Sequence, residues 1–308
     1  MKPKLVIVLG PTAVGKSDVA IDLALKFDAE IINADSQQVY RHMNIGTGKP
    51  GPEQRSRVAH HLIDVVDPDA EFNVALFRRM ALECAEDIRS RGKQVIVSGG
   101  TGLYLKALTE GLFVGPPKDD AIRQRLGEEA DKQGVAALYA RLMEADPMIV
   151  GRIHPNDRYR IIRALEVYEL TGKGITQWQG EHGFQDRLFD TLKIGLNRDR
   201  EELYDLINRR CAEMVERGLV DEVQSLQESG YSLDLPALQS IGYRHMGLYL
   251  RGDVSLEEAV VLMQRDTRHL AKRQLTWFRA DKEVRWFHPE RDREQVVRAT
   301  KSWLDRPK

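Results

Sequence analysis

The residues best suited to chemistry lie near the start of the chain, in the segment GPTAVGKS at residues 10–17. This segment satisfies the pattern GxxxxGK[ST] and lies between an apolar run and a helical pattern. Such a loop binds phosphate oxygens through its backbone N–H groups, while the lysine adds a positive charge and the serine hydroxyl can bind Mg²⁺. The sequence therefore predicts a polyphosphate site at Gly10, Pro11, Thr12, Ala13, Val14, Gly15, Lys16 and Ser17, with Ser17 as the metal ligand. A diphosphate ester would satisfy the same donors as a triphosphate.

A carboxylate follows the second apolar run, at Asp35 in NADSQQVY. The carboxyl ends of parallel strands converge on the phosphate loop, so Asp35 is expected near the phosphates. It could bind Mg²⁺, accept a proton from a nucleophile or cap a helix. The acid that usually binds magnesium in P-loop enzymes ends an apolar strand, and LIDVVD, with Asp64 and Asp67, matches this pattern poorly. This departure disfavours an ordinary ATPase.

A second glycine-rich turn, SGGTGLYLKAL at residues 98–108, precedes another helical pattern. Its glycines allow the backbone to approach a ligand closely, and Thr101 supplies a hydroxyl. Alone, the segment is as consistent with a structural turn as with a binding site. At the same sheet edge as the first loop, it is expected to form a second wall of one pocket.

The elements that must position these residues are strands alternating with helices. Apolar runs predict strands at 5–9, 29–36, 60–68, from 94, from 191 and at 284–289, and an amphipathic helix over 77–93 that ends at Gly92. This alternation predicts an α/β fold, a doubly wound parallel sheet with helices on both faces. Residues 116–188 are helical and charged, which predicts an all-helical insertion domain in a core domain formed by residues 1–115 and 189–308.

Three segments are basic, although the chain as a whole carries a formal charge of −1. The helix expected after Asn156 or Asp157 has Arg158, Arg160 and Arg163 in its first turns, where cations oppose the helix dipole. Residues 265–282 are also rich in arginine and lysine, with Trp277 and Phe278 expected in the core, and SIGYRH occupies residues 240–245. These segments fit either a nucleic-acid surface or a solvated charged face.

Composition excludes several other classes of protein. Cys84 and Cys211 are far apart and form no CxxC pair, and the histidines show no zinc-binding spacing. The first apolar run is too short for a signal peptide, and no run approaches the roughly 20 residues of a membrane span. We therefore expect a cytoplasmic protein without membrane association.

Seven motifs occur in one order along the chain: GPTAVGKS, NADSQQVY, GTGKP (46–50), GGTGLYLKAL, RIHPNDRYRIIRALEVYELTGK, QSIGYRH and AKRQLTWFR. Together they closely resemble the bacterial tRNA dimethylallyltransferases, also called tRNA isopentenyltransferases, from residue 5 to about residue 280. The resemblance implies transfer of a dimethylallyl group from dimethylallyl diphosphate to the exocyclic amine of the adenosine 3′ to the tRNA anticodon. It also implies Mg²⁺ dependence, with the anticodon stem-loop and dimethylallyl diphosphate as partners. We expect the protein to be a monomer.

By this resemblance, Asp35 is the general base, Thr101 hydrogen-bonds in the reaction centre, and Lys16 and the glycine loop stabilise the diphosphate leaving group. Arg217 is implied as a further diphosphate ligand through a looser match. The residues implied to contact tRNA are Asp35, Ser36, Gln37, Gln38, Thr101, Arg123, Tyr159, Arg160, Ile161, Ile162, Arg163, Ser240, Ile241, Gly242, Tyr243, Arg244, His245, Arg273, Gln274, Leu275, Thr276, Trp277, Phe278, Arg279 and Ala280.

Three other functions share some of these features. A small-molecule P-loop kinase would have the loop, the sheet and even a helical lid, but it would not need the basic segments. An adenylate isopentenyltransferase would use the same chemistry on free AMP, ADP or ATP. A non-catalytic P-loop RNA-binding module would leave Asp35 and Thr101 without a role.

Overall fold

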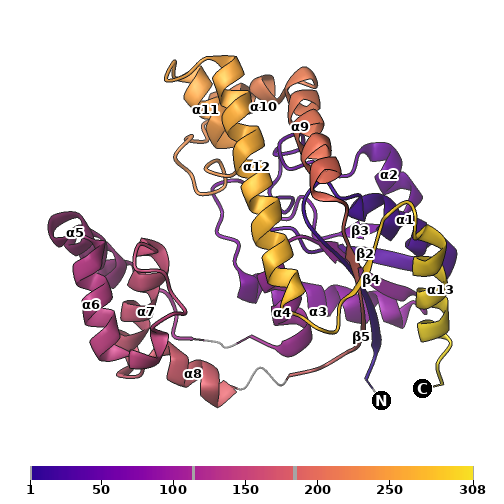
Figure 1. The fold of residues 1–308 in the computed structure, drawn as a ribbon, viewed down its shortest axis with the longest axis horizontal. Helices are drawn as coiled ribbons and strands as arrows, with labels where there is room; N and C mark the ends of the chain where they lie inside the picture. Colours follow the sequence, from indigo (N-terminus) through magenta and orange to yellow (C-terminus); the bar gives the residue numbers. More distant parts are fainter. Residues whose placement is uncertain (1, 113–114, 183–185, 308) are drawn as a thin grey trace. The chain divides into compact units, whose positions relative to one another are not determined.

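The computed structural model describes residues 2–112, 115–182 and 186–307 and contains one six-stranded sheet (Figure 1). Its strands are β1 (Lys4–Leu9), β2 (Ala29–Asn33), β3 (His60–His61), β4 (Gln94–Gly99), β5 (Asp190–Leu196) and β6 (Arg285–Phe287). The spatial order is β3-β2-β4-β1-β5-β6, and every neighbouring pair is parallel. This confirms the predicted fold class. Because β1 lies in the interior of the sheet, the glycine loop that follows it lies at the middle of the carboxyl edge.

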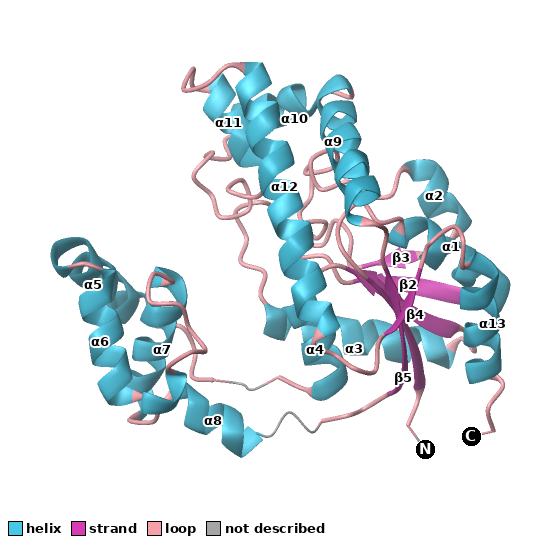
Figure 2. Ribbon diagram, viewed as in Figure 1, coloured by secondary structure: helices cyan, strands magenta, loops and turns pink. Residues whose placement is uncertain are grey.

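Helices cover both faces of this sheet (Figure 2). Alternate residues of β1 pack on opposite faces, Val6 and Val8 in one core cluster and Leu5, Ile7 and Leu9 in the other, as the two-residue period of a strand requires. The helices of this part of the chain are α1 (Lys16–Phe27), α2 (Pro52–Arg57), α3 (Val74–Ser90), α4 (Gly102–Glu110), α9 (Arg200–Glu216), α10 (Leu219–Glu228), α11 (Tyr243–Leu250), α12 (Leu256–Arg279) and α13 (Arg293–Leu304).

The predicted third strand over residues 60–68 is wrong in its extent. Strand β3 stops after His61, because Leu62 (φ 61°) and Asp64 (φ 58°) adopt left-handed backbone conformations that a strand cannot continue. A single bridge between Tyr40 and Val66 is the remaining parallel pairing of this stretch. Strand β2 likewise ends at Asn33, which leaves Asp35 in the loop beyond the sheet edge.

The chain divides into two compact units, one formed by residues 1–109 and 188–308 and the other by residues 110–187. The second unit contains α5 (Asp120–Gln133), α6 (Val135–Ala145), a short 3₁₀ turn (Pro147–Ile149), α7 (Arg158–Thr171) and α8 (Ile175–His182). Its apolar core is drawn from within the unit and includes Leu126, Leu138, Leu142, Ile161 and Leu165. Of the two residues expected to cap α7, Asp157 does so, since its side chain accepts a hydrogen bond from the N–H of Arg160 at 3.2 Å.

Within the described residues, none of the helices combines the length and the low polarity that crossing a bilayer would require.

Candidate active site

The glycine loop has the backbone conformation of an anion cradle. It leads from β1 into α1 with left-handed φ angles at Ala13 (63°) and Gly15 (102°). The backbone N–H groups of residues 13–17 find no hydrogen-bond acceptor among the residues that the structure describes. Unsatisfied N–H groups at the beginning of a helix are the donors that bind phosphate oxygens.

Lys16 carries the charge of this loop. Its Nζ donates to the carbonyl of Pro11 at 2.7 Å, which folds the side chain back along the loop. Burial lowers the pKa of Lys16 to about 8, an effect that the Asp35 carboxylate opposes and the Arg210 guanidinium reinforces. The Asp35 carboxylate and the Arg210 guanidinium are therefore both close enough to Lys16 to influence its ionisation.

The lowered pKa predicts how diphosphate binding depends on pH. In the ligand-free protein Lys16 loses its proton as the pH rises through about 8, whereas a bound anion favours the charged ammonium. We expect the affinity for inorganic pyrophosphate to fall across this range and binding to take up a proton. Calorimetry in two buffers of different ionisation enthalpy measures that uptake. Lys16→Met should bind more weakly and show no such uptake; an unchanged uptake in this variant would assign the proton to another group.

Asp35 has one carboxylate oxygen engaged and one available. Its Oδ1 accepts hydrogen bonds from the backbone N–H groups of Gln37 (2.8 Å) and Gln38 (3.4 Å), which fixes the turn after β2. Its Oδ2 has no hydrogen-bond partner among the described residues. Asp35 does not cap a helix, the structural role considered from the sequence: Oδ1 caps a turn instead, and Oδ2 remains available for chemistry.

Thr101 lies beside this turn because β2 and β4 end side by side. Gly99 approaches Ala34 so closely that a Cβ at position 99 would lie 2.1 Å from the Ala34 carbonyl oxygen. The N–H of Ser36 donates to Thr101 Oγ1 at 3.0 Å. The hydroxyl hydrogen of Thr101 has no acceptor within the described residues, so the side chain retains a donor next to Asp35.

Arg210, which sequence reasoning did not select, completes this cluster. The guanidinium donates no hydrogen bond within the described part of the chain, and burial holds its pKa below the ordinary value against the attraction of Asp35. It lies against the backbone of Gly48, where an added Cβ would fall 1.7 Å from Arg210 Nη2. The sequence feature that could have pointed to Arg210 is Gly48 in GTGKP. Only glycine fits there, because the Arg210 guanidinium lies so close and because the backbone has a φ of 61°. Arg217, the residue implied from the sequence, is exposed at the C-terminal end of α9.

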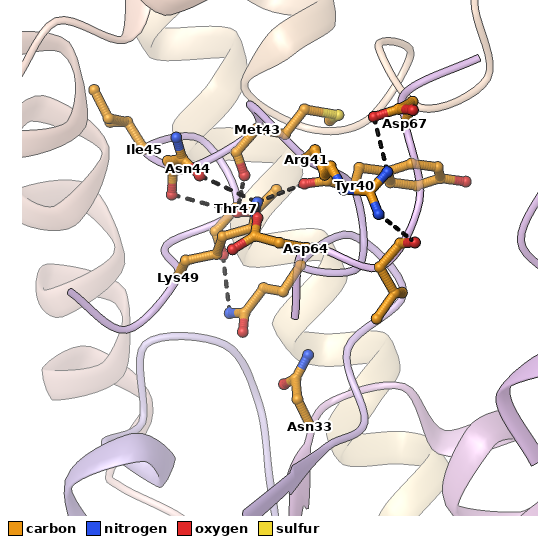
Figure 3. A network of polar contacts seen from close by, with 12 residues as sticks. Asn33, Tyr40, Arg41, Met43, Asn44, Ile45, Thr47, Lys49, Asp64 and Asp67 are labelled. Carbon is orange, nitrogen blue, oxygen red and sulfur yellow. Dashed lines mark hydrogen bonds and ion pairs between the residues drawn. The ribbon is translucent and has the colours of Figure 1, made fainter. Parts of the chain in front are cut away.

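A polar network fixes the loop that carries Gly48 (Figure 3). The buried Nζ of Lys49 donates to the carbonyl of Tyr40, to Asn44 Oδ1 at 3.2 Å and to Asp64 Oδ1 at 2.7 Å. Arg55 binds the other oxygen of Asp64 at 2.8 Å, and Arg41 binds Asp67 at 3.1 Å.

These ion pairs explain the poor magnesium-site pattern of LIDVVD. Although burial opposes it, hydrogen bonds from Lys49 and Arg55 hold the pKa of Asp64 below its ordinary value. Asp64 and Asp67 both neutralise basic side chains, and neither is an unpaired acid at a metal site.

Glu222 of α10 anchors the same loop from the other side. Its carboxylate accepts the N–H groups of Asn44 (3.0 Å), Ile45 (2.8 Å) and Gly46 (3.2 Å), together with the hydroxyl of Tyr243 at 2.5 Å. Charge-assisted hydrogen bonds of this kind are stronger than neutral ones. The loop is therefore held between the sheet and helices α10 and α11.

The basic end of α12 presents one exposed face. His269, Lys272, Arg273, Thr276 and Trp277 line a surface groove of about 450 Å³, and their spacing of three and four residues places them in one stripe. The expectation that Trp277 lies in the core is wrong, since this side chain is 46% exposed, whereas Phe278 is buried as expected. Trp277 packs over Gly102, where only a glycine leaves room for the indole.

The segment Ser240–His245 is mostly internal. Tyr243 and His245 are buried, and Arg244 pairs with Asp266, to which His245 Nε2 also lies close at 3.3 Å. The side-chain oxygens Ser240 Oγ and Gln37 Oε1 are buried without a hydrogen-bond partner within the described residues. Native structures rarely leave buried polar atoms unpaired, and a ligand is one explanation when they do.

In the helical unit the predicted contact residues differ in exposure. Tyr159 is 73% exposed and Arg160 is also exposed, whereas Ile161 is fully buried. Arg123 and Arg163 both bind the buried carboxylate of Glu166, at 3.0 Å and 2.7 Å.

The second guanidinium nitrogen of Arg163 donates to the carbonyl of Pro116 at 2.8 Å. Because removing either arginine would leave Glu166 less well paired, both support the fold of the unit.

A magnesium ion would rely on few protein ligands here. No group of three or more His, Cys, Asp or Glu side chains that could hold a metal occurs within the described ranges. Ser17 is exposed in the first turn of α1, and its hydroxyl has no partner within the part of the chain that the structure describes. Since Mg²⁺ in nucleotide and diphosphate sites takes most of its ligands from phosphates and water, this donor set fits the ion.

The parallel sheet, the amide-lined loop after β1 and the acid after β2 define a P-loop protein with an inserted helical unit. The family model described as IPP transferase matches residues 38–281. The chain is 53% identical over 285 residues to a tRNA dimethylallyltransferase 2 from Geotalea uraniireducens, covering 92% of each chain, and 52% identical to a tRNA dimethylallyltransferase from Geobacter sulfurreducens, with the same coverage. The chain belongs to the IPP transferase family.

Solved structures agree with this assignment. The tRNA isopentenylpyrophosphate transferase of Bacillus halodurans has a TM-score of 0.73 and 40% sequence identity, covering 99% of this chain and 97% of its own. A eukaryotic dimethylallyltransferase acting on tRNA has a TM-score of 0.83 and 30% identity, covering 99% of this chain and 80% of its own. The fold expected from the sequence is thus the fold of this family.

Proposed function

We propose that this protein transfers a dimethylallyl group from dimethylallyl diphosphate to the exocyclic amine of the adenosine 3′ to a tRNA anticodon. The single observation that carries the proposal is that Lys16, among unsatisfied loop amides, lies near both the Arg210 guanidinium and the Asp35 carboxylate, one oxygen of which has no partner within the described residues. A leaving diphosphate needs the cations and the amides, while an attacking amine needs the carboxylate. The names of the relatives, which are dimethylallyltransferases that act on tRNA, support a dimethylallyl donor and a tRNA acceptor as the substrates.

In this mechanism a C–N bond forms as the allylic C–O bond breaks. The loop amides, Lys16 and Arg210 stabilise the negative charge that develops on the departing diphosphate. Asp35 Oδ2 accepts the proton lost by the amine, and the Thr101 hydroxyl donates a hydrogen bond beside it. Magnesium bound at Ser17 would supply further charge neutralisation on the phosphates. Because the amine is a weak nucleophile, its alignment matters as much as the basicity of Asp35.

The arrangement also bears on the alternatives. In a P-loop kinase a carboxylate at a strand end binds the metal of a nucleoside triphosphate; Asp64 and Asp67 are engaged in ion pairs, which leaves Asp35 as the candidate for either role. An adenylate isopentenyltransferase would share the mechanism, and only the acceptor separates the two functions. The exposed basic stripe on α12 and the exposed Tyr159 and Arg160 favour an RNA acceptor.

The test uses unmodified tRNA, free AMP and two labelled donors, dimethylallyl diphosphate and ATP. We expect label to move from the prenyl donor to tRNA and not to AMP. Transfer to AMP alone would establish the adenylate activity, and transfer from ATP would establish a kinase. Tight tRNA binding without any transfer would leave only a binding module.

If α7 contacts RNA, Arg160→Ala should weaken tRNA binding and reduce the salt slope, d log K/d log [salt], by about one. Arg160 is the best probe in this helix because its guanidinium is largely exposed, whereas Arg163 supports Glu166. Titrations at several salt concentrations measure the slope. Arg298→Ala, on the exposed side of α13, is the control and should leave it unchanged. Equal slopes for wild type and Arg160→Ala would remove α7 from the interface.

A further inference from the structure

One side chain of α12 joins the two glycine-rich turns. Gln274 Oε1 accepts a hydrogen bond from the backbone N–H of Thr12 at 2.8 Å, and Gln274 Nε2 donates to the carbonyl of Gly100 at 2.9 Å. Thr12 belongs to the phosphate loop and Gly100 to the turn that carries Thr101. A single carboxamide therefore bridges the loop that holds the leaving group and the turn that faces the acceptor.

Helix α12 packs very closely against the glycines on either side of Thr101. A Cβ at position 100 would lie 2.3 Å from Gln274 Nε2, so only glycine allows the carboxamide to reach the backbone. One turn later, Trp277 packs over Gly102 with similar closeness, 2.4 Å to an added Cβ. Helix α12 is thus seated directly on the second glycine turn, and Trp277, which packs there, also lines the exposed groove.

The bridge also matters for the conformation of the loop. Ala13, adjacent to Thr12, adopts a left-handed backbone (φ 63°), which a residue with a side chain holds only when its surroundings enforce it. The hydrogen bond to Gln274 fixes the peptide group between Pro11 and Thr12, one peptide before the group that joins Thr12 to Ala13. Without that bond the loop is free to relax, and the N–H groups of residues 13–17 would no longer converge.

We propose that Gln274 is a positioning residue for the diphosphate: it holds the phosphate loop in its binding conformation from the helix that carries the basic stripe. The inference rests on the proposed function, since it names a determinant of that same site. It differs from the direct tRNA contact that the sequence resemblance implies for Gln274, because both ends of the carboxamide already bind the protein backbone.

The test measures binding of magnesium pyrophosphate to the RNA-free protein by calorimetry. Gln274→Met keeps the length of the side chain but removes both hydrogen bonds, and we expect a loss of affinity of about two- to tenfold. Gln274→Glu should lose more, because its second oxygen would face the Gly100 carbonyl and its charge would repel the anion. Arg273→Ala, one residue away in the exposed stripe, should bind pyrophosphate like the wild type and tRNA more weakly.

The kinetic readout separates positioning from a general loss of structure. At saturating tRNA, Gln274→Met should raise KM for dimethylallyl diphosphate more than it lowers kcat, with a thermal transition close to that of Arg273→Ala. If Gln274→Met and Gln274→Glu both bind pyrophosphate like the wild type while tRNA affinity falls, Gln274 is an RNA contact and the inference is overturned. Failure of the proposed function looks different, because then the wild type itself binds no pyrophosphate and transfers no prenyl group.

Discussion

Asp35→Asn should abolish most turnover while leaving tRNA affinity intact. The substitution keeps an oxygen that can accept the Gln37 and Gln38 N–H groups, so the turn after β2 should persist. It removes the basic oxygen, and loss of a general base typically costs about 10²- to 10⁴-fold in rate. Single-turnover assays with saturating tRNA and donor measure this loss directly, without contributions from product release.

Two controls make this result specific. Thr101→Ser keeps the hydroxyl that accepts the Ser36 N–H and should retain most of the activity. Asp35→Ala also removes the oxygen that caps the turn, so its tRNA affinity should fall below that of Asp35→Asn. Near-normal turnover in Asp35→Asn would remove this residue from proton transfer.

The second large effect concerns Arg210. Arg210→Ala should raise KM for dimethylallyl diphosphate about 10- to 100-fold, because hydrogen bonds to charged groups contribute about 1.5–3 kcal/mol. Arg210→Lys should recover part of the affinity, since it keeps the charge but not the planar fork of donors. Initial rates measured over a range of dimethylallyl diphosphate concentrations at saturating tRNA give KM for each variant relative to the wild type.

Gly48→Ala offers an independent route to the same site. The added methyl group would meet the Arg210 guanidinium and would require a left-handed backbone, so this variant should lose donor affinity although it changes no charge. Combined with Arg210→Ala, the two losses should be far from additive, because both act on one guanidinium. Gly252→Ala, another left-handed glycine with open space around it, controls for backbone strain alone. Additive losses of donor affinity would show that Gly48 and Arg210 act on donor binding independently.

The sequence sufficed for the features that depend on local pattern. Short apolar runs that end in glycine or in polar residues predicted the parallel sheet, and the spacing from Gly10 to Ser17 predicted the phosphate loop. Asp35 and Thr101 were selected because strand ends converge, and the hydrogen bond from Ser36 to Thr101 places the two segments together.

Features that depend on contacts between distant segments could not be predicted in this way. Arg210 is one of several arginines on an amphipathic helix, and only its approach to Gly48 distinguishes it from the exposed ones. Trp277 is half-exposed and packs over Gly102, a contact between segments far apart in the chain that no local pattern reveals. The third strand was overestimated because an apolar run does not reveal left-handed residues such as Leu62 and Asp64.

The self-contained core of residues 110–187 has a consequence for how such enzymes diversify. Because its apolar side chains pack against one another, this unit can change in sequence, or be exchanged for that of a relative, without repacking the sheet. Under the proposed function, RNA contacts made by this unit could then vary without any change in the residues proposed to hold the prenyl donor. A chimera carrying a relative's unit should keep its donor and acquire a new preference among RNA substrates.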